Sequence, residues 1–217
     1  RGRKLVMKIT KFGHSCVLID DHGLALMFDP GAFSELPEEL PHVDIVVITH
    51  KHFDHLNVEN LSLLANNNSA MKIVCNSEVA AEISNLNFQI EIVEQGQSYE
   101  LDNLKIEAFG KDHAVIHSSI PTISNTGYLV NEKLWYPGDS LTVLPKPVEI
   151  LLLPIVAPWS KISETMDFVA ASNAKVVIPV HDGFLKFGGP FYSMIKQWCA
   201  DRDIKFYEKI NYQSYEN

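Results

Sequence analysis

The segment VITHKHFDHL, residues 47–56, concentrates side chains that can bind a metal ion. It places His50, His52, Asp54 and His55 within six positions, directly after an apolar run rich in β-branched residues. A strand points alternate residues to one face, so it would project His50 and His52 together, and a turn into a following helix would bring Asp54 and His55 to the same place. Imidazole and carboxylate groups at this spacing are the ligands expected for zinc or a similar divalent ion. The alternative is a polar loop that happens to be rich in histidine, which nine histidines among 217 residues explain poorly.

Three further residues of the same chemical types follow strand-like runs later in the chain. They are His113 in FGKDHAVIHS, Asp139 in WYPGDSL and His181 in VVIPVHDGF. Each motif alone is a weak signal. The ordered set is a strong one.

The His50-x-His52-x-Asp54-His55 pattern resembles the HxHxDH signature of the metallo-β-lactamase-fold hydrolases, and the three later residues resemble that family's remaining ligands in the same order. The resemblance covers roughly residues 7–207 and implies an α/β fold, the four-layer αββα sandwich. By resemblance, His50, His52 and His113 would hold one metal ion, Asp54, His55 and His181 a second, and Asp139 would bridge the two.

The resemblance also implies a reaction. Two ions roughly 3.5–4 Å apart would clamp a hydroxide that attacks an ester, amide or phosphodiester centre. Asp54 would then act in catalysis as well as in metal binding. We expect zinc, although manganese, iron and nickel also suit these ligands.

The stretch HAVIH offers two candidates for the third ligand of the first ion. His113 is preferred because it follows the strand-and-glycine pattern that resembles the family. His117 would then take a catalytic role as a pocket residue, or would orient a ligand. If His117 is the ligand instead, His113 takes that outer role.

The segments KFGHSCVLID and LMFDPG resemble a branch of the family that includes ascorbate-6-phosphate lactonase-like proteins. In that interpretation His14 reaches the pocket and binds a substrate oxygen or assists proton transfer. Asp29 would accept a hydrogen bond from a ligand histidine. The alternatives are a packing histidine in a turn and a turn residue before Pro30. Trp159 is interpreted either as an apolar wall of the cleft or as a core residue, and Lys186 either as a solvated lysine or as a contact for an anionic substrate.

Hydrophobic patterning predicts strands and helices in two halves of similar plan. The predicted strands span residues 7–12, 15–19, 24–28, 45–49, 71–75, 90–93, 97–101, 104–109, 126–130, 134–136, 150–153, 175–179 and 204–207. The predicted helices span 56–65, 77–85 with Ser77 as cap, 163–171 and 191–200. We expect residues 7–217 to form a single metallo-hydrolase domain and residues 1–6 to be vector-derived or disordered.

The composition argues against several classes of binding partner. The net charge of −9, without a marked basic cluster, argues against a nucleic-acid-binding surface. No apolar stretch is long enough to span a bilayer, and no secretory signal pattern is visible. The three cysteines, Cys16, Cys75 and Cys199, form no CxxC pair and suggest reduced packing residues of a cytoplasmic protein. A homo-oligomer is compatible with the sequence.

These observations predict a metal-dependent hydrolase acting on a small-molecule ester, lactone or phosphodiester. A non-haem iron redox or oxygen-binding protein would use the same ligands and is the alternative. A third interpretation, a metal-binding regulator without activity, is disfavoured because every expected ligand is present.

Overall fold

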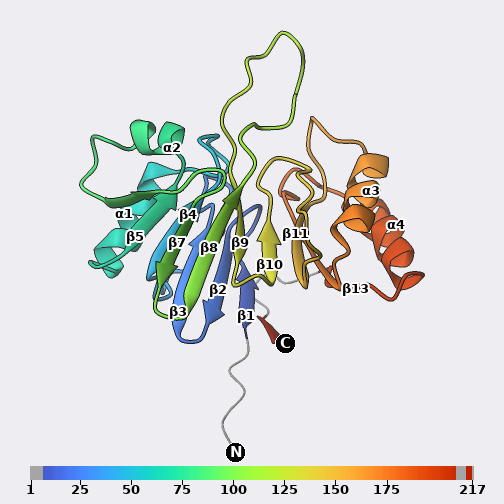
Figure 1. Ribbon diagram of the computed structural model, residues 1–217, viewed down its shortest axis with the longest axis horizontal. Helices are drawn as coiled ribbons and strands as arrows, with labels where there is room; N and C mark the ends of the chain where they lie inside the picture. The colour runs from blue at the N-terminus through green and yellow to red at the C-terminus, as the bar shows by residue number, and fades with distance from the viewer. Residues whose placement is uncertain (1–6, 209–213, 217) are drawn as a thin grey trace, which may run out of the picture.

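The protein folds into two seven-stranded sheets packed face to face, with two helices outside each sheet. The computed structural model describes residues 7–208 and 214–216. Figure 1 shows α1 and α2 on one side of the paired sheets and α3 and α4 on the other. The prediction for residues 1–6 concerns residues outside this description.

The first sheet contains the strand that leads into the histidine-rich segment. Its order is β14 (Ser214–Glu216), β1 (Lys8–Lys11), β2 (Val17–Asp21), β3 (Leu24–Phe28), β4 (Ile45–Ile48), β5 (Lys72–Cys75) and β6 (Gln89–Ile92). Pairing is antiparallel from β14 to β3 and parallel from β3 to β6. Helices α1 (Val58–Asn67) and α2 (Ser77–Glu82) provide the crossovers between its parallel strands.

The second sheet repeats this plan. Its order is β13 (Lys205–Phe206), β12 (Val176–Val180), β11 (Ile150–Pro154), β10 (Leu134–Tyr136), β9 (Gly127–Val130), β8 (Leu104–Phe109) and β7 (Ser98–Leu101). Pairing is antiparallel from β7 to β10 and parallel from β10 to β13. Helices α3 (Ile162–Ser172) and α4 (Gly189–Ala200) belong to this half.

Three apolar cores separate the four layers. The inner faces of both sheets meet around Phe28, Tyr128 and Tyr136, all nearly inaccessible to solvent. Outer cores lie between the first sheet and α1 and α2, and between the second sheet and α3 and α4. Strands such as β4 and β11 are therefore buried on both faces, which explains their continuous apolar sequences. The predicted αββα sandwich is confirmed.

The predicted elements are all present among the described residues, with ends that match or are shifted by up to three positions. Two details differ. The cap of α2 is Asn76, whose side chain accepts a hydrogen bond from the Val79 amide, and Ser77 is the first helical residue. Strand β14 has no counterpart in the prediction because it is short and exists by pairing with β1.

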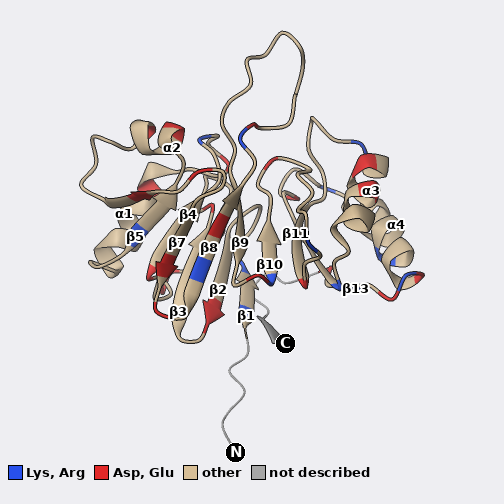
Figure 2. Ribbon diagram, viewed as in Figure 1, with Lys and Arg blue, Asp and Glu red and all other residues tan. Residues whose placement is uncertain are grey.

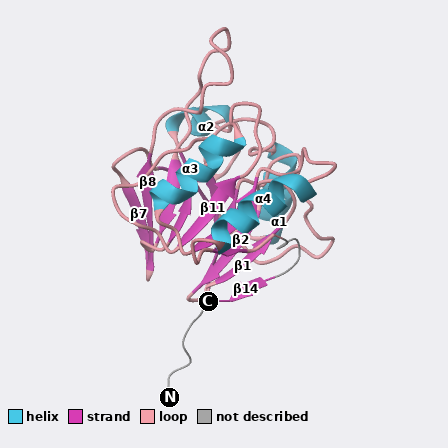
Figure 3. Ribbon diagram, turned by 90° about the vertical axis from the view of Figure 1, so that its right-hand side faces the viewer, coloured by secondary structure: helices cyan, strands magenta, loops and turns pink. Residues whose placement is uncertain are grey.

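One long loop, residues 110–126 between β8 and β9, rises beyond the edge of both sheets in Figures 1 and 3. Its outer part, residues 113–125, contains no lysine, arginine, aspartate or glutamate (Figure 2). The three cysteines are buried and free, as predicted. Within the described ranges, no helix has the length and apolar character needed to cross a membrane.

Candidate metal centre

The structure gathers the predicted ligands at one edge of the sandwich. Their donor atoms form two groups, each with all atoms within 4.8 Å of one another. The first group is His50, His52, His113 and Asp139; the second is His14, Asp54, His55 and His181. His52 is half-buried and the other seven residues are buried.

The ends of four strands supply these side chains. His50 and His52 follow β4, with Asp54 and His55 in the turn before α1, while His113 follows β8, Asp139 follows β10 and His181 follows β12. The turn can approach the loop between β3 and β4 so closely because residue 31 is glycine: a Cβ on Gly31 would lie 2.0 Å from the carbonyl carbon of Asp54. His181 adopts a φ of 60°, an uncommon conformation that turns the chain sharply where β12 ends.

Asp139 links the two groups. Its Oδ2 lies 3.2 Å from Nε2 of His113 and 3.1 Å from Nε2 of His181, and its Oδ1 lies 3.2 Å from Nε2 of His55. Ligands that share one zinc ion at about 2.0–2.2 Å lie roughly 3–3.5 Å from each other. The spacing therefore suits a carboxylate that serves both groups.

Two ligand histidines have their tautomer fixed by backbone carbonyls. His113 Nδ1 lies 2.6 Å from the carbonyl oxygen of Ala114, and His181 Nδ1 lies 2.7 Å from that of Val156. A carbonyl only accepts hydrogen bonds, so each Nδ1 must carry the proton and each neutral ring presents a bare Nε2. A bare Nε2 is the form that binds a metal ion.

Asp29 fixes two more histidines. Its Oδ2 accepts from His55 Nδ1 at 2.7 Å and from the Thr49 hydroxyl at 2.7 Å. Because the Thr49 hydroxyl donates to Asp29, its oxygen is left to accept from His50 Nδ1, 3.0 Å away. Asp29 thus makes the contact predicted for it, and it also acts on His50 through Thr49.

The atoms freed in this way have no hydrogen-bond partner in the described part of the chain. Nε2 of His50, His55 and His181 and Oδ1 of Asp139 are all buried and unsatisfied. An unsatisfied buried polar atom costs about 1–3 kcal/mol, and here several point into one space. Divalent ions would satisfy them all, so these residues fit a metal centre of nitrogen and oxygen ligands.

His14 differs from the other histidines. Its Nδ1 accepts a hydrogen bond from the Gly183 amide at 2.9 Å, so its Nε2 carries the proton and can donate to Asp54 Oδ2 at 3.3 Å. A Cβ on Gly183 would lie 2.9 Å from this Nδ1, so a glycine is needed for the contact. His14 lies beside Asp54 and His181, and this tautomer makes it a donor to Asp54 rather than a metal ligand.

The protonation states of Asp54, Asp139 and His50 favour metal binding. Burial opposes ionisation of Asp54, yet the hydrogen bond from His14 and the nearby His55 outweigh it and lower its pKa to about 2. Burial likewise opposes ionisation of Asp139, but His55 and His181 hold its pKa well below the usual value. Burial lowers the pKa of His50 well below its usual value, which keeps the ring neutral. Ionised carboxylates and neutral imidazoles are the forms that ligate.

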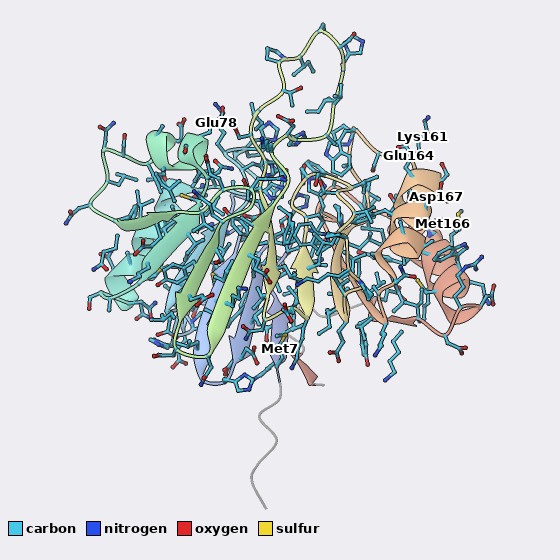
Figure 4. The ribbon with its side chains drawn as sticks, viewed as in Figure 1. Met7, Glu78, Lys161, Glu164, Met166 and Asp167 are labelled. Atoms are coloured by element: carbon cyan, nitrogen blue, oxygen red, sulfur yellow. The ribbon has the colours of Figure 1, made fainter. Side chains whose placement is uncertain are left out.

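The structure does not bring His117 to either group. It is exposed on the loop of residues 110–126, where its Nδ1 lies 2.8 Å from the Ser119 hydroxyl. His113 lies in the first group instead. The base of the loop is anchored by Glu78 of α2, labelled in Figure 4, which accepts from the Ser124 amide at 2.6 Å and pairs with Lys51 at 2.8 Å.

Trp159 has a role that neither sequence interpretation anticipated. Its indole Nε1 donates to Asp139 Oδ2 at 3.0 Å, so the half-buried ring touches the carboxylate that links the two groups. Thr49 and Gly183 were also missed. The only sequence signal for Trp159 was its place in the loop after the buried strand β11.

Comparison with known proteins finds a matching family model and several relatives in sequence. A family model described as beta-lactamase superfamily domain matches residues 8–181. Protein Rv0786c of Mycobacterium tuberculosis is 36% identical over 184 residues, covering 82% of this chain and 85% of that protein. UPF0173 metal-dependent hydrolase MJ1163 of Methanocaldococcus jannaschii is 28% identical over 188 residues, covering 80% and 83%.

Solved structures share the fold. Igni18, a metallo hydrolase of Ignicoccus hospitalis, superposes with a TM-score of 0.78 at 21% identity, covering 98% of both chains. CmlA, a diiron β-hydroxylase of Streptomyces venezuelae, superposes with a TM-score of 0.71 at 16% identity, covering all of this chain and 54% of that one. At these identities the likeness concerns the fold alone.

Proposed function

Because the chain belongs to the beta-lactamase superfamily, we propose that it is a metal-dependent hydrolase whose two His/Asp groups hold two divalent ions. The observation that carries this proposal is the set of buried, unsatisfied ligand atoms around Asp139. The relatives named as metal-dependent hydrolases support the same reaction class.

Each ion would have three ligands of its own and share one. We call the first site His50, His52 and His113, and the second site Asp54, His55 and His181; Asp139 would serve both. Ions bound there would polarise the electrophilic oxygen of a substrate and lower the pKa of a coordinated water toward neutrality. Zinc is the proposed metal, with manganese, iron or nickel as alternatives.

Residues outside the two sites would hold the metal ligands in position. His14 holds Asp54 by a hydrogen bond at 3.3 Å, and Asp29 holds His55 at 2.7 Å, so both ligands are positioned before any ion arrives. His52 is half-buried, which leaves the first site the more accessible one. The proposed substrate is a small ester, lactone or phosphodiester.

Metal analysis combined with an activity screen tests the proposal. Protein purified without chelator should contain two transition-metal ions per chain, and it should hydrolyse at least one of bis-p-nitrophenyl phosphate, a lactone or a thioester with added zinc or manganese. Asp54→Ala should lose the second ion and most of the activity. His22→Ala, an exposed histidine on the β2–β3 turn, is the matched control. Absence of any transition metal, together with unchanged hydrolysis by Asp54→Ala, would contradict the proposal.

A diiron redox protein is the second candidate, because CmlA shares the fold and the ligand types suit iron. It predicts that the purified protein contains iron and absorbs visible light. Zinc content with a colourless protein would exclude it.

A further inference from the structure

Exposed phenylalanines gather around the candidate metal centre. In the described part of the chain the exposed ones are Phe33, Phe53, Phe184 and Phe187, with exposed fractions of 39%, 60%, 51% and 76%. They come from three loops at the ligand edge: β3–β4, β4–α1 and β12–α4. Clustered exposed aromatic rings are typical of a ligand-binding surface.

The ring of Phe33 touches the rings of both Phe53 and Phe184. The centroid of Phe33 lies 5.3 Å from that of Phe53 and 5.4 Å from that of Phe184, both in edge-to-face arrangements. The loops are also joined, because the Ala32 amide donates to the Phe53 carbonyl at 2.7 Å. We call Phe33, Phe53 and Phe184 the phenylalanine wall. The contacts between its rings and the hydrogen bond between two of its loops hold the three side chains together.

The phenylalanine wall continues into the second site. The imidazole of His14 lies 5.6 Å from the Phe33 ring and 5.0 Å from the Phe184 ring, and His181 lies 5.6 Å from Phe184. A molecule whose reacting group reached Asp54 and His181 would therefore place its adjoining atoms against these rings.

Two of the nearby cations are already held in ion pairs. Lys11 is buried and forms an ion pair with Asp182 at 2.5 Å, and Lys51 pairs with Glu78 at 2.8 Å. Lys186 lies over the Phe187 ring, 5.6 Å from its centroid. The surroundings of the second site thus favour an apolar group over an additional phosphate or carboxylate.

We propose that the phenylalanine wall binds the apolar acyl or aryl group of a carboxylic ester, thioester or lactone. The inference rests on the proposed function and narrows its substrate class. Hydrolysis adds water across the C–O or C–S bond and gives a carboxylic acid and an alcohol or thiol, so no further reactant is needed. A bound substrate would remove exposed aromatic surface from water, which is where its binding energy would come from.

A series of p-nitrophenyl esters tests this assignment. With zinc-loaded protein, kcat/KM should be about tenfold or more higher for the octanoate than for the acetate, since burying each methylene contributes a severalfold gain. The octanoate-to-acetate ratio should fall toward one in Phe53→Ala and in Phe184→Ala. Leu63→Ala removes an equally exposed apolar side chain, 52% accessible on α1, and should keep the wild-type ratio.

A binding measurement separates failure of this inference from failure of the proposed function. Calorimetric titration with acetohydroxamate and octanohydroxamate should give about tenfold tighter binding of the longer compound to the zinc-loaded protein, and Phe184→Ala should abolish the difference. If this difference is found but the protein hydrolyses none of the esters, lactones, thioesters and phosphodiesters tested, the phenylalanine wall stands and the hydrolase proposal fails.

Other occupants of the phenylalanine wall would give distinct results. Equal rates and equal affinities for short and long compounds would overturn the inference. So would an unchanged acyl preference in Phe53→Ala accompanied by loss of dimer in sedimentation or of binding to phosphatidylcholine vesicles, because the rings would then serve a second copy of the chain or a membrane surface.

Discussion

The two proposed ion sites have similar ligands but unequal support. In the second site every ligand is held by a protein partner: Asp54 by His14, His55 by Asp29, and His181 by the Val156 carbonyl. In the first site, His52 has no side-chain hydrogen bond among the described residues, and it is the one half-buried member.

This difference has a physical consequence. Partners outside the ligand shell fix ring orientation and tautomer, and losing one typically costs about 10–100-fold in metal affinity. The second site is therefore built in advance, whereas the first must order His52 when an ion binds. We expect the first ion to exchange more readily and the second to be retained.

Asp139→Ala removes the group common to both sites and should have the largest effect. Both ions should be lost, because Asp139 lies within 3.2 Å of ligand nitrogens from each site. Activity should fall by roughly 10³-fold or more. Elemental analysis and kcat measure the result, and retention of one full equivalent of metal would show that Asp139 serves a single site.

His55→Ala and His52→Ala directly test the difference in how firmly the protein holds the ligands of the two sites. Each should lose one ion, but only His55→Ala should destabilise the metal-free protein, by about 1–3 kcal/mol, because it removes a buried partner from both Asp29 and Asp139. His52→Ala should change the unfolding free energy by less than about 1 kcal/mol. Urea denaturation in the presence of chelator measures both, and equal losses would contradict the difference in support.

Asp29→Asn and Thr49→Val should show which hydrogen bonds contribute to the metal affinity of each site. Asp29 contacts His55 directly and His50 through Thr49, so Asp29→Asn should weaken both sites by about 10–100-fold. Thr49→Val removes the link to His50 and the hydrogen bond from this hydroxyl to Asp29, but it keeps the contact between Asp29 and His55, so it should weaken the first site alone. Competition with a chromophoric zinc chelator gives the two affinities. A second site weakened by Thr49→Val would show that the Asp29 contacts are not separable.

Local sequence predicted the part of the centre that one turn builds. His50, His52, Asp54 and His55 are close in the chain, and a strand followed by a tight turn suffices to place them. The layers were likewise readable, because buried parallel strands and amphipathic helices leave distinct patterns. What local sequence could not determine was the pairing between strands, and so β14 was missed.

The remaining contacts depend on the tertiary fold. The Gly183 amide meets His14 from 169 residues away, a pairing that no local pattern encodes. His113 and His117 are four residues apart and alike in type, and the path of their loop separates them by burying one and exposing the other. The phenylalanine wall has the same origin, since its members come from three loops that meet only in the folded chain.

Trp159→Phe should have the smallest effect, and it should lower the metal affinities of the two sites equally. It keeps the aromatic ring but removes the N–H that donates to Asp139 Oδ2 at 3.0 Å. Hydrogen bonds to a charged group contribute about 1.5–3 kcal/mol, and partial exposure reduces this, so both affinities should fall by roughly three- to tenfold. Because Asp139 contacts both sites, the ratio of the two affinities should stay as in the wild type.

The indole of Trp159 should also report metal binding through its fluorescence. The change of tryptophan fluorescence on adding zinc should disappear in Trp159→Phe and persist in Trp198→Phe, whose ring packs on Arg202 of the neighbouring turn. If instead only one affinity falls, the indole supports that site alone, and the inequality between the sites has a further source in Trp159.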